Sequence, residues 1–319
     1  MPRLTLFMLM LALPGASIAN PANRAADVMR QLHDPNGAVL IASHRGCHNP
    51  APRHGLPATA PENSRLGLER CIAIGVDIVE MDVRRSRDGH LVIIHDATVD
   101  RTTDGHGRVS DLTLAQMRQL HLRDDEGGKV TTVSDQRVMT LEELLRAAGD
   151  GLVLNLDVKD ASYPEVVAEV IRLGAEQRVI VKTVAGIASP PLAATVPFDR
   201  VPFMPILSAS DEAGTDLAAI ARRQSAGGRQ PLGYELPVMD PGQLPAVAAE
   251  ARRAGVRIWL NSLFQGFVRG WGGDAVAVAA PDDVWGRMVA GGVSIIQTDY
   301  PEALAAYLSE LKLRKGAAR

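Results

Sequence analysis

Charged side chains lie two residues apart at the ends of two β-like runs of this chain. Glu80 and Asp82 end one run, and Asp157 and Lys159 end another. Because alternate residues of a strand point to one face, each run would present its charged groups together. Convergent carboxylate oxygens suit a hard cation such as Ca²⁺ or Mg²⁺, and a neighbouring ammonium suits phosphate. The pattern predicts a metal site on Glu80, Asp82 and Asp157, with Lys159 beside it as a phosphate ligand.

Two histidines follow other apolar runs. His44 follows residues 39–43, and His95 follows residues 91–94. Imidazole titrates near neutral pH, so one ring can accept a proton while the other donates one, each worth about 10²–10⁴ in rate. Arg45 carries the planar fork that pairs with two phosphate oxygens. We interpret the two histidines as an acid/base pair and Arg45 as a phosphate ligand, which points to a metal-dependent phosphodiesterase.

These groups need a scaffold that brings many strand ends together. Eight short β-like runs alternate with helical or connecting stretches, which is what an α/β fold of the (β/α)8 TIM-barrel type requires. The active site of such a barrel lies at the carboxyl ends of its strands. The predicted strands lie near residues 39–43, 76–82, 152–158, 178–183, 202–207, 232–236, 256–261 and 293–298, and the amphipathic stretches near 64–74, 140–148, 164–173, 243–254 and 301–313.

One segment, from residue 84 to about residue 139, interrupts this alternation after the second strand. A turn signal at residues 87–90 joins two β-like runs, and Gly107 and Gly127-Gly128 add further loops. We predict a small insertion beside the barrel mouth that brings His95 over the metal. Its polar loops are where we expect substrate selection.

The ordered set of motifs resembles the glycerophosphodiester phosphodiesterase family. The motifs that carry the resemblance are His44-Arg45-Gly46, Pro61-Glu62-Asn63-Ser64, Glu80-Met81-Asp82, Asp88-Gly89, His95-Asp96, residues 101–105 and 154–159, Trp259-Leu260-Asn261 and residues 298–301. The resemblance implies the metal, acid/base and phosphate roles given above, with Glu62 supporting the site and Trp259 lining the substrate pocket. It also implies hydrolysis of a glycerophosphodiester to an alcohol and glycerol 3-phosphate. The nucleophile would be water or the substrate's own glycerol hydroxyl.

The chain departs from the family pattern at two places. The family usually has a Glu-x-Lys motif where this chain has Asp157, one methylene shorter, and the choice between Ca²⁺ and Mg²⁺ stays open. The stretch from residue 47 to residue 60 is longer than the family's, and its prolines prevent a helix, so it should form a loop over the strand ends. His48 and His54 in this loop would be extra metal ligands or substrate contacts, or else solvated.

Other polar residues near predicted strand ends are further candidates. Lys182 could join the phosphate site, and Glu235 and Asn261 could contact the alcohol moiety. Asp299 could orient another side chain. Each of these residues could equally be a structural polar group at the barrel rim.

The stretch from residue 262 to residue 285 reads as a loop with exposed aromatic residues followed by a helix. It could cover an apolar or quaternary ammonium group through cation–π contact, or its rings could simply pack the loop down. The aromatic residues are Phe264, Phe267, Trp271 and Trp285.

Composition is consistent with a compact enzyme that acts on a small molecule. The 319 residues are 46% hydrophobic, enough for one large core, and the net charge of −3 gives no basic surface for nucleic acid. Residues 1–19 resemble a cleavable signal peptide, because Arg3 precedes ten apolar-type residues that are too few to span a bilayer. We expect cleavage after Ala19 and a single periplasmic or secreted domain over residues 20–319. An uncleaved anchor is the alternative, and oligomeric state stays open.

An exported chain with two cysteines could pair them. Cys47 follows the first strand, and Cys71 falls on the apolar face of the first long helical stretch, roughly 12 Å from its start. Either the two form a disulfide, or Cys71 is buried and Cys47 is free.

Two other functions fit parts of the pattern. A phospholipase D-like enzyme of the same architecture would act on lysophospholipids or sphingolipids, and exposure of Phe264, Phe267 and Trp271 would favour it. A non-catalytic phosphodiester-binding protein would not need two histidines beside three carboxylates, so the residue set argues against it.

Overall fold

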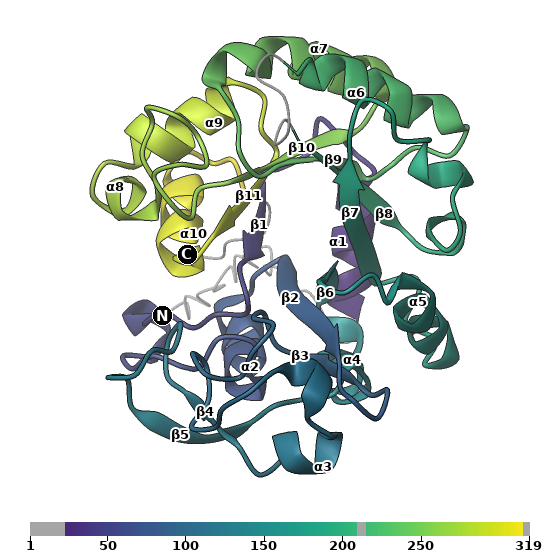
Figure 1. Cartoon of the computed structure of the whole chain (residues 1–319). Coiled ribbons are helices and arrows are strands. Elements are labelled where there is room, and N and C mark those ends of the chain that lie inside the picture. The colour runs from purple at the N-terminus through teal and green to yellow at the C-terminus, as the bar shows by residue number, and fades with distance from the viewer. Residues whose placement is uncertain (1–22, 209–214, 315–319) are drawn as a thin grey trace, which may run out of the picture.

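The computed structural model describes residues 23–208 and 215–314 of the chain. Eight parallel strands form a closed ring, and helices surround it (Figure 1). The ring closes because the first barrel strand pairs with both the second and the last. All eight predicted strands are confirmed, and with them the (β/α)8 barrel. In ring order they are β1 (Leu40–Ser43), β2 (Ile78–Arg85), β6 (Val153–Val158), β7 (Val179–Ala185), β8 (Phe203–Leu207), β9 (Gly233–Leu236), β10 (Arg257–Asn261) and β11 (Ile295–Thr298).

Helices follow most barrel strands, and one helix overlaps each of the five predicted amphipathic stretches. The connection from β7 to β8 differs, because its described residues form only short 3-10 turns. Pro190, Pro191 and Pro197 lie in this connection and remove the backbone donors that an α-helix needs. The helices of the barrel are α1 (Arg24–Leu32), α2 (Arg65–Ile74), α4 (Leu141–Ala148), α5 (Tyr163–Arg172), α6 (Leu217–Gln224), α7 (Leu244–Ala254), α8 (Asp274–Ala279), α9 (Arg287–Ala290) and α10 (Pro301–Glu310).

Two buried apolar clusters hold the barrel together. The larger one lies between the outer faces of the strands and the surrounding helices. The smaller one fills the barrel interior at the amino ends of the strands, where Val28 and Leu32 of α1 pack against Leu40, Ile78 and Ile180. Helix α1 thus covers this end of the barrel.

The insertion after β2 is a small layer with a core of its own (Figure 1). Strand β3 (Leu91–Ile93) pairs antiparallel with the end of β2, and β4 (His121–Arg123) pairs antiparallel with β5 (Val133–Arg137). The short helix α3 (Leu114–Met117) completes it, with Val92, Met117 and Leu122 buried between these elements. The layer carries residues 95–101 and 124–126 toward the carboxyl end of the barrel.

A disulfide ties the loop after β1 to the first outer helix. Cys47 and Cys71 are bonded, with their Cα atoms 5.2 Å apart, and both side chains are buried. Of the two alternatives for these cysteines, the disulfide is therefore confirmed. The predicted signal peptide lies outside the described residues. Within residues 23–208 and 215–314, we find no helix of the length and apolarity that a bilayer span requires.

Candidate active site

Three carboxylates converge at the carboxyl ends of β2 and β6. Asp82 and Asp157 are register partners, and Glu80 lies two residues earlier on the face of β2 that Asp82 shares. One oxygen from each of the three can be chosen so that all lie within 4.8 Å of one another. We call Glu80, Asp82 and Asp157 the carboxylate site. Asn155, the register partner of Glu80, is fully buried and its amide finds no hydrogen-bond partner within the described chain. An all-oxygen donor set beside an unpaired amide fits a hard divalent cation.

Three basic side chains balance the carboxylate site, starting with Lys159. Its Nζ lies 2.8 Å from an oxygen of Asp157 and 3.0 Å from one of Asp82. Although burial opposes the charged form, Asp82 and Asp157 raise the pKa of Lys159. The lysine is partly exposed, so its ammonium can turn from the carboxylates to a phosphate at the mouth.

Lys182 enters the same site from β7 and is far more enclosed. Its side chain is 3% exposed, and its Nζ lies 3.6 Å from Asp157 and 3.3 Å from Glu235. Despite burial, these carboxylates raise the pKa of Lys182, so it stays an ammonium ion. We conclude that Lys182 balances the carboxylates from within the barrel; its predicted contact with phosphate stays a prediction.

Arg45 is held in an unusual backbone conformation directly after His44. Its φ of 51° lies in the left-handed region, which a non-glycine residue adopts at a cost. The conformation directs its N–H to Glu80 Oε2, 3.0 Å away, while its guanidinium donates to Glu62 Oε2 at 2.9 Å. Its Nε lies 3.6 Å from Asp82. Strain at this position is thus coupled to contacts with the carboxylate site.

Charge within the carboxylate site is unevenly distributed. Burial raises the pKa of Glu80 to about 7, and Asp82 acts in the same direction, whereas Lys182 and His44 oppose the shift. Burial also acts to raise the pKa of Asp82, but Lys159, His95 and Arg45 outweigh it and hold that pKa well below its usual range. Each predicted catalytic histidine is therefore close enough to influence one carboxylate of the site.

A chain of ionic hydrogen bonds orients His95. Its Nδ1 lies 2.7 Å from Asp96 Oδ1, and Arg101 pairs through two nitrogens with Asp96 and through two with Glu62. Burial lowers the pKa of His95, Arg45 also lowers it, and Asp82 and Asp96 oppose the shift. Glu62 thus supports the site from its position between two arginines. The sequence motifs contained Asp96 and Arg101 but gave no signal of this pairing.

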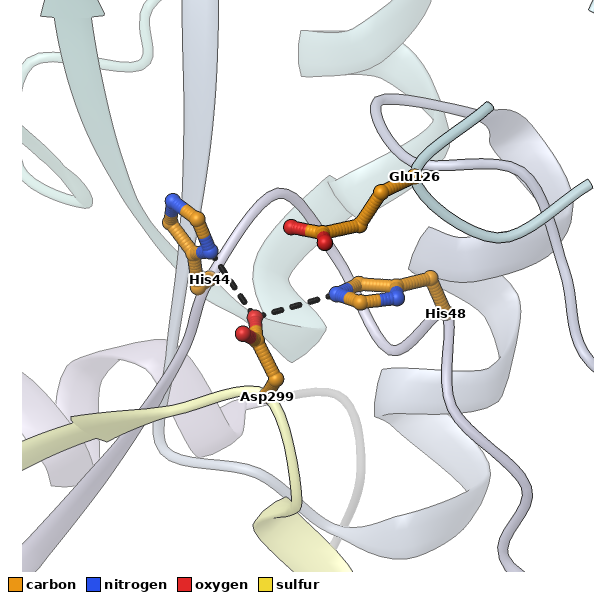
Figure 2. A group of neighbouring side chains, drawn as sticks. All are labelled: His44, His48, Glu126 and Asp299. Carbon is orange, nitrogen blue, oxygen red and sulfur yellow. Dashed lines mark hydrogen bonds and ion pairs between the residues drawn. The ribbon is translucent and has the colours of Figure 1, made fainter. Parts of the chain in front are cut away.

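His44 belongs to a second polar group, shown in Figure 2. Its Nδ1 lies 2.8 Å from Asp299 Oδ1, and His48 Nε2 lies 3.0 Å from the same oxygen. Glu126, from the insertion, lies beside them, and ligand atoms of all four side chains lie within 4.8 Å of one another. We call His44, His48, Glu126 and Asp299 the histidine cluster. Asp299 is placed to orient His44, one of the roles that the sequence allowed for it.

The two histidines of the loop after β1 have different surroundings. His48 is 1% exposed, and its Nδ1 pairs with Asp125 at 2.9 Å. Burial opposes protonation, yet Asp125 and Asp299 together raise the pKa of His48 to about 10. The alternative of a solvated His48 is therefore wrong. His54 instead bonds to Glu302 of α10 at 2.7 Å, outside the cluster.

One buried acid behind the cluster was missed by sequence analysis. Asp274, at the start of α8, accepts the backbone N–H of Asp299 at 2.7 Å and the hydroxyl of Ser262. Burial raises the pKa of Asp274 to about 6, and the charge of Asp299 acts in the same direction. Asp274 lies in a helical stretch far from the recognised motifs, so no local pattern could have found it.

Three residues with predicted substrate contacts lie beneath the carboxylate site. Trp259 is fully buried, and its Nε1 donates to Asn261 Oδ1 at 2.8 Å and to Gln297 Oε1 at 3.0 Å. Asn261 in turn donates to Glu235 Oε1 at 3.2 Å. They form a hydrogen-bonded floor that also holds Lys182, and their contacts with substrate stay predictions.

The aromatic residues of the stretch from residue 262 to residue 285 are less exposed than predicted. Phe264 is 49% exposed, but Trp285 is buried and Trp271 packs against the main core. Phe267 packs against Phe264 in a tilted arrangement, with ring centroids 5.5 Å apart. The expectation of exposed aromatics is wrong for Trp285, because the neighbouring helices and Ser262 enclose it.

Comparison with known proteins shows which proteins this chain resembles. Residues 44–257 match the glycerophosphoryl diester phosphodiesterase family. The chain is 34% identical over 152 residues to the glycerophosphodiester phosphodiesterase of Caldanaerobacter subterraneus subsp. tengcongensis, covering 46% of this chain and 58% of that protein. It is 33% identical over 150 residues to human glycerophosphodiester phosphodiesterase 1, covering 45% and 39%. The matched segment thus spans roughly half of these relatives or less.

Solved structures show the same fold. A glycerophosphoryl diester phosphodiesterase from Parabacteroides distasonis superposes with a TM-score of 0.69 at 21% identity, over 90% of this chain and 92% of that one. An Oleispira antarctica phosphodiesterase, solved with the product sn-glycerol-3-phosphate, superposes with a TM-score of 0.57 at 18% identity, over 85% and 97%. Since the family match covers most of the barrel and both predicted catalytic histidines, the chain belongs to the glycerophosphoryl diester phosphodiesterase family.

Proposed function

We propose that this protein hydrolyses glycerophosphodiesters to an alcohol and glycerol 3-phosphate. The observation that carries the proposal is the surroundings of the carboxylate site. Three basic side chains and two histidines, each histidine hydrogen-bonded to a carboxylate, lie beside it at one end of the barrel. The names of the matched relatives and the glycerol phosphate bound to the Oleispira enzyme support the same substrate class.

A divalent metal fits the carboxylate site. Glu80, Asp82 and Asp157 would hold it, because their oxygens already converge and the buried amide of Asn155 lies unpaired beside them. Hard oxygen ligands favour Ca²⁺ or Mg²⁺. When bound, such an ion neutralises phosphate charge and lowers the pKa of a hydroxyl that it contacts.

The residues of the chain supply binding and proton transfer. Arg45 and Lys159 would pair with the phosphate oxygens. The lowered pKa of His95 keeps its ring neutral near pH 7, which suits a general base. His44, oriented by Asp299, would donate a proton to the leaving oxygen. The nucleophile's oxygen attacks phosphorus, its proton passes to His95, and the bond to the leaving alcohol breaks as His44 protonates it.

The direct test is release of glycerol 3-phosphate by the mature protein. Glycerophosphocholine, glycerophosphoethanolamine and glycerophosphoglycerol would each be supplied with EDTA, Ca²⁺ or Mg²⁺. We expect no release in EDTA and release on addition of one metal. A folded, metal-loaded protein that releases nothing from all three substrates would contradict the proposed function.

Location outside the cytoplasm is part of the proposal. The disulfide between Cys47 and Cys71 supports it, because such bonds persist in oxidising compartments. We propose a periplasmic or secreted protein, released after Ala19. The phospholipase D-like alternative is not favoured, since Trp271 is packed against the core rather than free to contact lipid.

A further inference from the structure

The histidine cluster has a donor set different from that of the carboxylate site. It offers two imidazole nitrogens and two carboxylates from three segments of the chain, the loop after β1, the insertion and the end of β11. Imidazole with carboxylate suits a borderline cation such as Zn²⁺, whereas Ca²⁺ and Mg²⁺ prefer oxygen alone. One ligand atom from each of the four side chains lies within 4.8 Å of the others, and the bonds of about 2 Å in a tetrahedral zinc site would bring these atoms to roughly 3.3 Å from one another. The two nitrogens lie 2.8 and 3.0 Å from the shared oxygen of Asp299.

A second carboxylate holds His48 from behind. Its Nδ1 faces Asp125 at 2.9 Å, which leaves Nε2 directed into the cluster. Metal-binding histidines characteristically donate their other ring nitrogen to a carboxylate, which fixes the ring and increases its basicity. The disulfide at the preceding residue, Cys47, anchors the same loop. The ring of His48 is therefore held in place before any ligand arrives.

Charge around the cluster leaves room for a cation. Asp125, Glu126, Asp274 and Asp299 contribute four carboxyl groups, and none forms an ion pair with a lysine or arginine among the described residues. The side chain of Glu126, within this described region, hydrogen-bonds to no other side chain although it lies beside both histidines. This carboxylate is therefore free to coordinate a cation together with the two imidazoles.

We propose that the histidine cluster is a second metal site, which binds Zn²⁺ or a similar borderline cation and thereby inhibits the enzyme. An acid/base histidine must alternate between one and two ring protons. A cation on Nδ1 of His44 occupies one of those positions, so the ring can no longer cycle. The binding part stands on the cluster's geometry, whereas the inhibition part rests on the proposed function.

Zinc binding is tested without reference to turnover. The mature protein would be stripped of metal, supplied with saturating Mg²⁺ to fill the carboxylate site, and titrated with Zn²⁺ by calorimetry, with bound metal counted by mass spectrometry. We expect one Zn²⁺ per chain, and Co²⁺ in its place should give a visible ligand-field absorption. Failure to bind either ion would overturn the proposal.

Matched variants locate the zinc site. Glu126→Gln removes a ligand that bonds to no other described side chain, so the fold should be unaffected, and His48→Ala removes a second ligand. Each should weaken Zn²⁺ binding by about tenfold or more. His54→Ala is the control, because this histidine belongs to the same loop but pairs with Glu302. Equal affinity in Glu126→Gln, His48→Ala and His54→Ala would place the zinc elsewhere and contradict the proposal.

Inhibition is then measured against each variant's own zinc-free rate. Zn²⁺ should abolish the Mg²⁺- or Ca²⁺-supported activity of the wild type and of His54→Ala, whereas Glu126→Gln should need about tenfold or more Zn²⁺ for the same inhibition. Zinc that binds stoichiometrically without slowing turnover would overturn the inhibitory role. If no glycerophosphodiester is hydrolysed at all, the proposed function fails, while the stoichiometry still decides whether the cluster binds metal.

Discussion

The carboxylate site and the histidine cluster lie at the same end of the barrel but balance their charge in different ways. In the carboxylate site, three acids face Lys159, Lys182 and Arg45. In the histidine cluster, imidazoles are the partners of Asp125 and Asp299, and no lysine or arginine pairs with these carboxylates in the described structure. A cation arriving at the first site can release a lysine to the phosphate. The second site has none to release, so a cation there changes only the histidines.

His44 belongs to the histidine cluster and also acts on Glu80, whereas His95 acts on Asp82 of the carboxylate site and lies outside the cluster. We expect His44→Ala and His95→Ala each to reduce kcat by about 10²–10⁴, because each removes one proton-transfer group. Only His44→Ala should also lose zinc binding. Steady-state kinetics with a zinc titration of both variants checks this, with circular dichroism to show that they fold. An ordinary rate in either variant would remove that histidine from the mechanism.

The disulfide should matter more to the histidine cluster than to the carboxylate site. It closes a loop between residues 24 positions apart, so Cys71→Ser with Cys47→Ser should cost about 3 kcal/mol of unfolding free energy. Because Cys47 precedes His48, Zn²⁺ affinity should fall as well, while the metal concentration for half-maximal activity changes little.

Urea denaturation and zinc calorimetry of this double variant measure the two effects. Arg65→Ala, which removes an exposed pair with Glu69 on the helix of Cys71, serves as the control for changes to that helix. Unchanged stability and unchanged zinc affinity would show that the loop is held by its other contacts alone.

Glu80→Gln should change metal binding at the carboxylate site without changing the histidine cluster. The substitution removes one oxygen ligand, so half-maximal activity should need about tenfold or more Ca²⁺ or Mg²⁺. A high concentration of either metal should partly restore the maximal rate. Zinc binding by the histidine cluster should be unaffected. Activity titrated against metal concentration, beside Glu126→Gln as the converse variant, gives the comparison. Unchanged metal dependence would mean that Glu80 is not a ligand.

The two sites also differ in how far the sequence could predict them. Glu80, Asp82 and Asp157 lie at fixed spacings on regular strands, so strand periodicity and barrel topology suffice to bring them together. The histidine cluster is assembled from a loop, an insertion and the end of β11. Which of His48 and His54 turned inward depended on partners such as Asp125 and Glu302, far apart in the sequence. Short loop signals carry no information about such contacts.

The smallest effect expected is a pH shift that distinguishes the roles of the two histidines. Asp96 accepts a hydrogen bond from His95 and raises its pKa, whereas burial, Arg45 and Lys159 lower it. Asp96→Asn should therefore lower the pKa of His95 further, by about one pH unit or less. A general base is active when deprotonated, so the rate falls as pH drops through its pKa. The acid limb of the kcat/KM profile should accordingly move to lower pH.

Profiles of Asp96→Asn and of Asp100→Asn would be recorded side by side. Asp100 is the matched control, since its carboxylate pairs with Gly107 and His106 at the surface of the insertion. If the alkaline limb moves and the acid limb does not, His95 is the acid and the two histidines exchange roles. If neither limb moves, His95 does not titrate during the reaction, and the proton must pass through His44 alone. Only a shifted acid limb supports the proposed division of roles. In that division His95, beside the carboxylate site, is the base, and His44, oriented within the histidine cluster, is the acid.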